Sequence, residues 1–289
     1  MKIAILGARG FLGQKLCPAL IAQGHEVTGF VLNPGQEMVG GIKYKSVLEL
    51  LELPISSESH YDISINLAAR RSTRILPFSD SEVHDFTYEI PKKFLVRTSN
   101  PQTIVVNAST YIQNFEGKTG QTVDTYGAAK EKLSEFLKYE SRNGRFETQD
   151  LFFFTLYGIG DRPNHLVPLL LNAAKSGDEI ALSPGHQLMN LLYVDDAVQN
   201  ILNCISHKPK AAYCKNYVWS EDYFSVRDLV GTIQSTIGLE IKAIWGGREY
   251  VGHEMMQPWP IPMTQLPSFS APTDLEKGIK QIWNATEAV

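Results

Sequence analysis

A short glycine-punctuated segment near the start of the chain most constrains its fold. Residues 3–6 form an apolar run that is too short for a helix and suits a buried parallel strand. Gly7, Gly10 and Gly13 follow it, three residues apart, and leucines at helical spacing continue behind them. Such a strand, turn and helix N-terminus can bind a pyrophosphate, because small residues let the backbone approach and unpaired N–H groups attract the anion. We therefore predict a dinucleotide-binding turn made of Gly7, Ala8, Arg9, Gly10, Phe11, Leu12 and Gly13.

The pattern beyond this turn predicts an α/β fold, a doubly wound parallel sheet of the Rossmann type with a smaller C-terminal substrate lobe. Strand-like and helical segments alternate up to about residue 206, after which Trp, Tyr, Gly and Pro crowd the sequence. We expect strands at 25–32, 61–69, 102–107, 147–156 and 190–194, and helices at 11–23, 124–138, 165–176 and 195–205. The expected domains are 1–163 with 190–206 for the dinucleotide, and 164–189 with 207–289 for the substrate.

Composition and charge exclude several classes of protein. The chain of 289 residues has 43% hydrophobic and 20% charged residues, which is typical of globular proteins. The net charge is −4 and no dense Lys/Arg stripe occurs, so we expect no nucleic-acid partner. Because no long apolar stretch occurs, we expect no membrane span. The three cysteines lack C-x-x-C spacing, which is typical of reduced thiols and predicts a cytoplasmic protein without a metal site.

The end of the second expected strand bears on the choice of cofactor. In NAD-binding proteins with this turn, an acidic residue usually lies there and binds the ribose hydroxyls. Here the sequence reads Val31-Leu32-Asn33, so the charge that would repel a 2′-phosphate is missing. Arg9 in the glycine turn either supplies a guanidinium to that phosphate or is a solvated loop residue. We favour NADPH, keep NAD as the alternative, and expect Asn33 at the cofactor.

Polar residues in the middle of the chain form the group best suited to catalysis. Ser109 follows the 102–107 strand, and Tyr126 and Lys130 lie four residues apart, on one face of the 124–138 helix. A tyrosine is a poor acid–base catalyst near neutral pH unless its anion is stabilised, which a lysine one turn away does by Coulomb attraction. The lysine can also bind the cofactor ribose. Ser109, with Thr110 as its substitute, can hold a reacting carbonyl against the tyrosine.

The chain resembles the extended short-chain dehydrogenase/reductase family of nucleotide-sugar epimerases, dehydratases and reductases over nearly its whole length. The glycine motif of the family matches residues 7–13, and its catalytic Tyr/Lys motif matches residues 126–130 (YGAAK). Three further stretches are similar to the H-L-A-A, V-Y-G-P-G and V-Y-V-D-D motifs of the family, namely 66–69, 156–162 and 193–196. The resemblance implies additional cofactor-binding residues, namely Leu67, Ala68, Ala69, Asn107, Leu156 and Tyr157.

Three features narrow the reaction that this resemblance implies. Family dehydratases carry an Asp-Glu pair directly after the catalytic Ser/Thr, whereas Thr110-Tyr111-Ile112 follows Ser109 here, so dehydration is not expected. Family epimerases usually keep the acidic residue that holds NAD permanently, and its absence fits an exchangeable NADPH. Residues 107–113 (NASTYIQ) are similar to the branch that makes CDP-linked dideoxyhexoses, the CDP-abequose and CDP-paratose synthases.

We therefore predict an oxidoreductase that uses NADPH to reduce the C4 ketone of a nucleotide-linked 4-keto-deoxyhexose, of the CDP type, for lipopolysaccharide biosynthesis. Tyr126 would give the proton, Lys130 would stabilise the Tyr126 anion and bind the ribose, and Ser109 or Thr110 would polarise the carbonyl. The resemblance places the nucleotide-diphosphate sugar on Ser109, Thr110, Tyr111, Asn164, Val167 and Gln187. Arg248 follows two glycines and either binds the diphosphate through its guanidinium or is a solvated loop residue.

Two other functions stay open at this point. A nucleotide-sugar 4-epimerase would keep NAD tightly bound through purification, whereas the predicted reductase exchanges its cofactor. A catalytically silent dinucleotide sensor that regulates a partner would have no use for the proton donor Tyr126. The sequence also leaves the sugar, the base and the oligomeric state open, with a homodimer as one expectation.

Overall fold

The computed structural model describes residues 1–54, 60–72, 77–266 and 269–287. The chain forms two compact units. Unit 1 consists of Met1–Phe153, Val198–Val218 and Pro262–Phe269, and unit 2 consists of Phe154–Ala197, Trp219–Ile261 and Ser270–Val289. Each unit has a hydrophobic core of its own.

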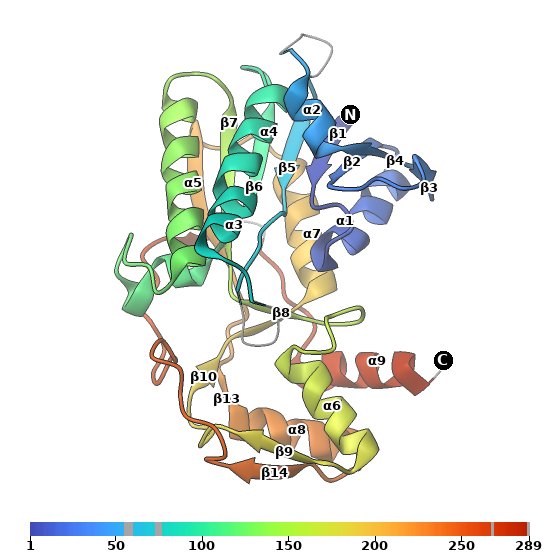
Figure 1. The fold of residues 1–289 in the computed structure, drawn as a ribbon, viewed down its shortest axis with the longest axis vertical. Coiled ribbons are helices and arrows are strands. Elements are labelled where there is room, and N and C mark those ends of the chain that lie inside the picture. The colour runs from blue at the N-terminus through green and yellow to red at the C-terminus, as the bar shows by residue number, and fades with distance from the viewer. Residues whose placement is uncertain (55–59, 73–76, 267–268, 288–289) are drawn as a thin grey trace. The chain divides into compact units, whose positions relative to one another are not determined.

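A nine-stranded sheet forms the centre of unit 1 (Figure 1). Its strand order is β15-β12-β7-β6-β5-β1-β2-β4-β3, and all neighbouring strands are parallel except β3 and β4. The strands are β1 (Lys2–Leu6), β2 (Glu26–Val31), β3 (Met38–Val39), β4 (Ile42–Ser46), β5 (Ile63–Asn66), β6 (Ile104–Thr110), β7 (Glu147–Phe153), β12 (Tyr213–Val218) and β15 (Thr264–Gln265). This order confirms the predicted doubly wound sheet.

Helices cover both faces of this sheet (Figure 1). One face carries α1 (Phe11–Ala22) and the part of α7 (Val194–Ile205) that belongs to unit 1, whereas α2 (Val47–Glu52), α4 (Ile90–Thr98) and α5 (Thr125–Arg142) cover the other. A short helix, α3 (Asp80–His84), leads through a π-helical turn, Asp85–Glu89, into α4. Ala4 and Leu6 of β1 belong to the core beneath α4 and α5. Because strand side chains alternate, Ile3 and Ile5 face the opposite side, and both of these are fully buried.

The sheet changes winding direction at β1, which pairs with β2 on one side and with β5 on the other. In an open parallel sheet, ligands bind beyond the carboxyl ends of the strands at such a point. The predicted site segments of unit 1 follow these ends. The glycine turn follows β1, residues 67–69 follow β5, and Ser109 and Thr110 are the last residues of β6.

Gly7 and Gly13 hold the turn after β1 in a form that a side chain would obstruct. Gly7 has a φ of +85°, and a Cβ there would lie 2.9 Å from the backbone nitrogen of Ala68. A Cβ on Gly13 would meet the carbonyl oxygens of Gly7 and Ala8, the latter at 2.7 Å. The close approach of α1 to the turn therefore requires glycine at position 13, and the backbone conformation requires it at position 7.

Unit 2 combines short strand pairs with helices packed on them. The pairs are β8 (Thr155–Tyr157) with β11 (Leu191–Tyr193), β9 (Glu179–Leu182) with β14 (Lys242–Trp245), and β10 (Leu188–Met189) with β13 (Phe224–Ser225). The helices are α6 (Leu166–Ser176), α8 (Val226–Ile237) and α9 (Leu275–Glu287). Their apolar faces meet in one core around Leu170, Ile233 and Ile279, each of which is fully buried.

The observed units differ from the expected domains at four strands, among them β15, which was expected in the lobe but pairs with β12 in the main sheet. The expected strand at 147–156 is divided, because β7 ends at Phe153 in unit 1 and β8 begins at Thr155 in unit 2. β11 was expected to return to the dinucleotide domain, but it pairs with β8 in unit 2. β12 was expected in the lobe, but it pairs with β7 in the main sheet. Backbone pairing between strands decides which unit each strand joins. The side-chain pattern of residues 207–289 does not reveal this pairing.

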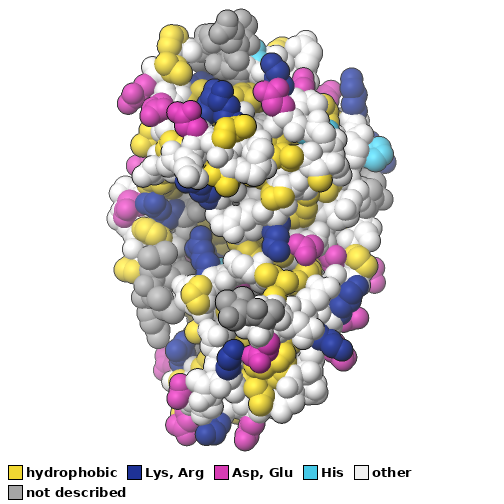
Figure 2. All heavy atoms as spheres, turned by 90° about the vertical axis from the view of Figure 1, so that its right-hand side faces the viewer, with side chains coloured by type: hydrophobic (Ala, Val, Ile, Leu, Met, Phe, Trp, Pro, Cys, Tyr) yellow, Lys and Arg dark blue, Asp and Glu magenta, His cyan; other side chains and the backbone are white. Residues whose placement is uncertain are grey.

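The surface carries charges of both signs. On the face drawn in Figure 2, Lys and Arg side chains (dark blue) lie among Asp and Glu side chains (magenta), in keeping with the small net charge of −4. Within the described ranges, no helix is long and apolar enough to cross a membrane.

The glycine packing predicts opposite effects for two Gly→Ala substitutions in helices. Gly13→Ala should lower the free energy of unfolding by about 1–3 kcal/mol, because its methyl group overlaps backbone oxygens that cannot easily move. Gly231→Ala in α8 is the matched control, since a Cβ there meets nothing within 4 Å. It should raise the free energy of unfolding by about 0.5–1 kcal/mol through helix propensity. Urea titration measures both, and equal stability of the two variants would contradict the packing described for α1.

Candidate active site

Helix α5 carries Tyr126, Lys130 and Ser134 on successive turns of one face, next to the end of β6. The helix begins at Asp124, whose carboxylate accepts a hydrogen bond from the backbone N–H of Gly127 at 2.7 Å. Because the three side chains are spaced by four residues, they share one face. Each of them contacts a different residue of β6. The structure thus brings the predicted Tyr/Lys pair to the predicted strand end.

Lys130 is buried, and its ammonium group joins three segments of unit 1. Its side chain is on α5, and Nζ donates to the carbonyl oxygen of Ala108 on β6 at 2.6 Å and to that of Ala68 after β5 at 3.4 Å. Nζ lies 6.0 Å from the centre of the Tyr126 ring. Burial lowers the pKa of Lys130 to about 8, and the negative charge of Asp150 partly opposes this shift. With a pKa of about 8, Lys130 should change its charge within a pH range in which its titration can be followed.

Tyr126 is surrounded by groups that act on its phenol in opposite directions. Burial raises the pKa of Tyr126 to about 12, and the charges of Asp124 and Tyr111 act in the same sense. The guanidinium of Arg71, whose central carbon lies 5.6 Å from the ring centre, and a hydrogen bond with Thr110 act against it. Tyr126 is thus protonated at neutral pH, while cationic and hydroxyl groups stand ready to stabilise its anion.

Ser109 and Thr110, at the end of β6, contact different partners. The hydroxyl of Ser109 is buried and donates to Oδ1 of Asp150 at 2.6 Å. The hydroxyl of Thr110 forms a hydrogen bond with that of Tyr126. The backbone N–H of Thr110 donates to Oε1 of Gln113 at 2.9 Å, which orders the strand end. The hydroxyls of Ser109 and Thr110 were both predicted to hold a carbonyl against Tyr126. Among the described contacts, that of Thr110 is the one that reaches Tyr126.

A buried polar network lies behind these residues, and the sequence did not predict it. The amide of Asn66 on β5 donates to Asn107 on β6 at 2.8 Å, and the amide of Asn107 donates to Asp150 on β7 at 2.8 Å. The hydroxyl of Tyr213 on β12 donates to the other oxygen of Asp150 at 2.7 Å. The network therefore links four adjacent strands. Its one signal in the sequence was a carboxylate, Asp150, inside a strand-like segment rich in phenylalanine.

Arg71 is a second neighbour of the site that the sequence did not single out. It follows the predicted cofactor residues Leu67, Ala68 and Ala69, and its guanidinium forms an ion pair with Asp124 at 3.2 Å. Because Asp124 caps α5, this ion pair ties the segment after β5 to the helix that carries Tyr126. The signal in the sequence was its position directly behind the 66–69 motif.

The glycine turn and α1 fit the pyrophosphate of a dinucleotide. All residues of α1 are described, and this helix has no capping side chain at Gly10 and no acidic residue in its first turn. Its terminal N–H groups and the positive end of its dipole are therefore suited to an anion. Ala8 and Leu12 are buried beneath the turn, whereas Gly10 is exposed. Across from the turn, Ala68 lies so close to Gly7 that a side chain on Gly7 would not fit.

Arg9 reaches from the glycine turn to the residues that follow β2. Its guanidinium donates to the carbonyl oxygen of Asn33 at 2.9 Å and to that of Pro34. It also lies over the ring of Tyr44, with 4.3 Å between the guanidinium carbon and the ring centre. The side chain of Arg9 is exposed and is held by these contacts, and its binding of a 2′-phosphate stays a prediction. It stands where an acidic residue would bind the ribose in an NAD-binding protein.

Two of the predicted residues of unit 2 lie in its hydrophobic core. Tyr157 lies in the core of unit 2, and its hydroxyl donates to the carbonyl oxygen of Asp274 at 3.4 Å. Val167 is 3% exposed and packs in the same core. These contacts account for both side chains by packing, so a role in binding would have to use their backbone. Leu156 on β8 is partly buried.

The other predicted residues of unit 2 are polar side chains in loops. Gln187 is buried, and its side-chain amide donates to the hydroxyl of Ser183 at 2.7 Å. Asn164 is partly buried just before α6. Arg248 is exposed, and its backbone N–H donates to the carbonyl oxygen of Leu182 at 3.1 Å. Their roles in substrate binding stay predictions.

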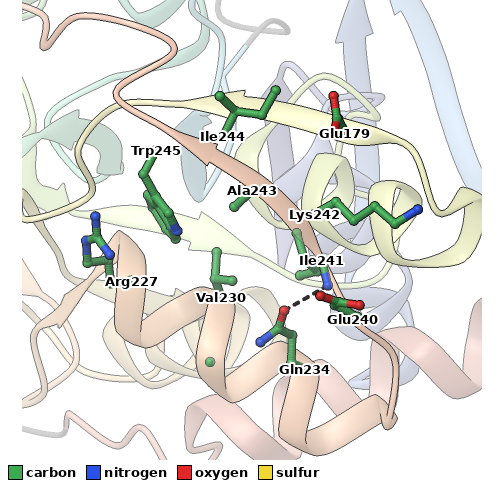
Figure 3. A pocket seen from close by; sticks show the side chains of 11 residues that line it. Glu179, Arg227, Val230, Gln234, Glu240, Ile241, Lys242, Ala243, Ile244 and Trp245 are labelled. Atoms are coloured by element: carbon green, nitrogen blue, oxygen red, sulfur yellow. Dashed lines mark hydrogen bonds between the residues drawn. The ribbon is translucent and has the colours of Figure 1, made fainter.

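Unit 2 also contains a groove of about 460 Å³ between α8 and β14 (Figure 3). Figure 3 shows Arg227 beside Trp245 at one end of this groove. The guanidinium carbon of Arg227 lies 4.3 Å from the ring centre of Trp245, and Nε donates to the carbonyl oxygen of Pro184 at 2.8 Å. Among the described residues, the groove is lined by none of the predicted site residues.

Comparisons with known proteins agree on the kind of chain this is. Residues 3–214 match the model of the NAD dependent epimerase/dehydratase family. The chain is similar to a CDP-abequose synthase of Yersinia pseudotuberculosis, with 28% identity over 219 residues that cover 71% of this chain and 74% of the relative.

Two solved structures are similar over the whole chain. A UDP-glucuronic acid 4-epimerase of Bacillus cereus, in complex with UDP-glucuronic acid and NAD, has a TM-score of 0.82 and 18% identity and covers 100% of this chain and 99% of its own. MoeE5, in complex with UDP-glucuronic acid and NAD, has a TM-score of 0.81 and 20% identity and covers 100% of both chains. At these identities the likeness concerns the fold.

Because the hydroxyls of Ser109 and Thr110 have different contacts, removing each should lower the free energy of unfolding by a different amount. Ser109→Ala should lower the free energy of unfolding by about 1–3 kcal/mol, because it removes a donor from a buried carboxylate. Thr110→Val, which keeps the shape of the side chain and the backbone hydrogen bond, should cost less than about 1 kcal/mol. Urea unfolding measures both variants. A larger loss for Thr110→Val than for Ser109→Ala would show that the two hydroxyls have been assigned the wrong partners.

Proposed function

This chain belongs to the NAD dependent epimerase/dehydratase family, and we propose that it reduces the C4 ketone of a CDP-linked 4-keto-deoxyhexose with NADPH. The observation that carries the proposal is the position of Arg9, which lies beside Asn33 where a family member that retains NAD would have a carboxylate. A guanidinium there suits the 2′-phosphate of NADPH. An exchangeable NADPH suits a net reduction, whereas an epimerase returns the hydride to its own substrate.

Tyr126 and Thr110 are suited to act on the ketone oxygen. The reduction adds a hydride to the carbonyl carbon and a proton to its oxygen. NADPH, when bound, would supply the hydride and be converted to NADP⁺. Tyr126 donates its phenolic proton to that oxygen, and the hydroxyl of Thr110 donates a hydrogen bond to it. The raised pKa of Tyr126, about 12, keeps the proton in place until it is needed. The positive charges of Arg71 and Lys130 then stabilise the tyrosine anion.

Lys130 is suited to bind the ribose of the cofactor. Its ammonium group has three donors, and two of its contacts are the carbonyl oxygens of Ala108 and Ala68. Ala68 belongs to the segment after β5 that the resemblance assigns to the cofactor. Leu67, Ala69 and Asn107 complete this proposed lining together with residues 7–13.

The choice of reduction and of a CDP sugar rests on further observations. No acid directly follows Ser109 or Thr110 in the sequence, which speaks against dehydration. The relative from Yersinia pseudotuberculosis is a CDP-abequose synthase, and this supports a CDP-linked substrate and a place in lipopolysaccharide biosynthesis. In unit 2, Arg248 and Gln187 are the proposed ligands of the nucleotide diphosphate, because an exposed guanidinium can bind two oxygens at once. Asn164 of unit 2 and Tyr111 of unit 1 are further proposed substrate ligands.

Purification and a turnover assay separate this proposal from its alternatives. The purified protein should carry no bound NAD, and it should oxidise NADPH when a CDP-4-keto-deoxyhexose is added. Retained NAD together with interconversion of C4 epimers would identify a 4-epimerase instead. Binding of NADPH without turnover of any nucleotide sugar would identify the regulatory alternative.

Removing the phenolic hydroxyl should abolish most turnover while the cofactor still binds. Tyr126→Phe should lower kcat by roughly 10²–10⁴, the usual contribution of a general acid. Thr110→Val should lower kcat by roughly 10², the usual contribution of one preorganised donor. The dissociation constant of NADPH, followed by fluorescence, should change less than about twofold in both, since neither hydroxyl contacts the pyrophosphate turn.

Tyr139→Phe is the control for these variants, because Tyr139 lies on the same helix and is 66% exposed. It should keep the wild-type rate. If Tyr126→Phe kept more than about a tenth of the wild-type kcat, Tyr126 would not be the acid.

Replacing the proposed phosphate ligand should change the preference between cofactors. Arg9→Ala should weaken NADPH by about 1.5–3 kcal/mol through loss of a charge-assisted bond, and should weaken NADH much less. Arg9→Lys should fall between wild type and Arg9→Ala, because it keeps the charge and loses the planar fork. Isothermal titration with both cofactors measures this. Equal losses for NADPH and NADH would remove Arg9 from the 2′-phosphate and return NAD to first place.

A further inference from the structure

Two buried charged residues of unit 1, Lys130 on α5 and Asp150 on β7, both form hydrogen bonds with β6. Lys130 is 1% exposed, and its ammonium group contacts the carbonyl oxygen of Ala108. Asp150 is fully buried, and its carboxylate accepts hydrogen bonds from the side chains on either side of Ala108, those of Asn107 and Ser109. The two charged groups are thus held by three consecutive residues of β6.

The groups around Asp150 suit a carboxylate that carries its charge. The amide of Asn107 and the hydroxyl of Ser109 donate to Oδ1 at 2.8 and 2.6 Å, and the hydroxyl of Tyr213 donates to Oδ2 at 2.7 Å. An ionised carboxylate only accepts hydrogen bonds, and each of these groups can donate. Hydrogen bonds of this kind favour the ionised form of a carboxylate.

The ammonium group of Lys130 needs such a charge. Its two described hydrogen bonds go to neutral carbonyl oxygens, which replace only part of the hydration that a buried cation loses. Burial alone therefore favours the neutral amine. In the low dielectric of the interior, a carboxylate acts on a cation beyond contact distance and shifts the balance back.

We propose that Asp150 is a positioning residue whose carboxylate acts as the counter-charge of Lys130 and keeps the ammonium group protonated. The hydrogen bonds that each group forms with β6 hold the two groups apart. The direction of the electrostatic effect agrees, because the charge of Asp150 raises the pKa of Lys130 against the opposing effect of burial. The separation leaves the third donor of Lys130 for another ligand. The consequence for catalysis rests on the role proposed for Lys130 above, whereas the charge coupling itself does not.

The other titratable groups near the pair are few among the described residues. Tyr126 and Glu131 are on α5, Arg71 follows β5, and Tyr213 is on β12. Glu131 accepts a hydrogen bond from Gln113 at 2.8 Å. Burial raises the pKa of Tyr126 to about 12 and raises that of Tyr213 as well, so both are neutral where Lys130 titrates.

The titration of Lys130 in the free protein tests this coupling. Lysine labelled with ¹³C at the ε carbon gives one resonance per residue, and Lys130→Met identifies that of Lys130. In wild type this resonance should titrate near pH 8. In Asp150→Asn the midpoint should fall by at least about one pH unit, a tenfold change in the proton dissociation constant.

Tyr213→Phe is the matched control, because it removes one hydrogen bond from Asp150 and keeps the charge. Its Lys130 midpoint should stay within about 0.3 pH units of wild type. If Asp150→Asn folds and its Lys130 resonance has the same midpoint as in wild type, the counter-charge role is overturned. If Asp150→Asn lowers the midpoint and Tyr213→Phe lowers it equally, packing is the cause, and the role is overturned as well.

A second measurement covers the case in which Asp150→Asn does not fold. The double variant Lys130→Met/Asp150→Asn removes both charges, so it should be more stable in thermal unfolding than Asp150→Asn alone. A double variant that is no more stable than Asp150→Asn would overturn the proposal. None of these measurements needs cofactor or substrate, so their failure leaves the proposed ketone reduction untouched, and failure of the reductase assay leaves the charge coupling untouched.

Discussion

The buried ammonium group of Lys130 is the interaction on which the arrangement of the site depends. It ties α5 to the carbonyl oxygen of Ala108 on β6 and to that of Ala68 after β5. Because a charge in the protein interior is costly unless its hydrogen bonds are satisfied, these two contacts hold the helix in one register against the sheet. Tyr126 lies one turn before Lys130, so the same register brings its phenol to the end of β6.

The two hydroxyl residues at the end of β6 have different roles. Ser109 joins the buried network around Asp150, and Thr110 reaches Tyr126. A buried polar group of this network loses free energy of folding if it has no hydrogen-bond partner. The network therefore favours one arrangement of the strand ends that carry the reacting groups. Rigid support of this kind allows donors to be oriented before a substrate arrives.

Particular residues show how far sequence reasoning reached. The glycine spacing predicted the turn after β1 because its cause is local: Gly7 adopts a positive φ, and Gly13 contacts the turn only a few residues before it. The spacing of Tyr126 and Lys130 likewise predicted a shared helix face. The position of β12 in the main sheet and the burial of Val167 were not predicted, since both depend on partners distant in the sequence. Asp150 was missed for the same reason, because its donors come from β6 and β12.

The sequence by itself determined the doubly wound fold, the glycine turn and the pairing of a tyrosine with a lysine, because each follows from local periodicity and backbone sterics. The tertiary structure alone decided which hydroxyl of β6 meets Tyr126 and that Arg9 is held beside Asn33. It also decided that a carboxylate lies buried near Lys130. These contacts join residues that are far apart in the chain, so only the packing of α5 and the strands against one another brings their atoms within hydrogen-bonding and Coulomb range.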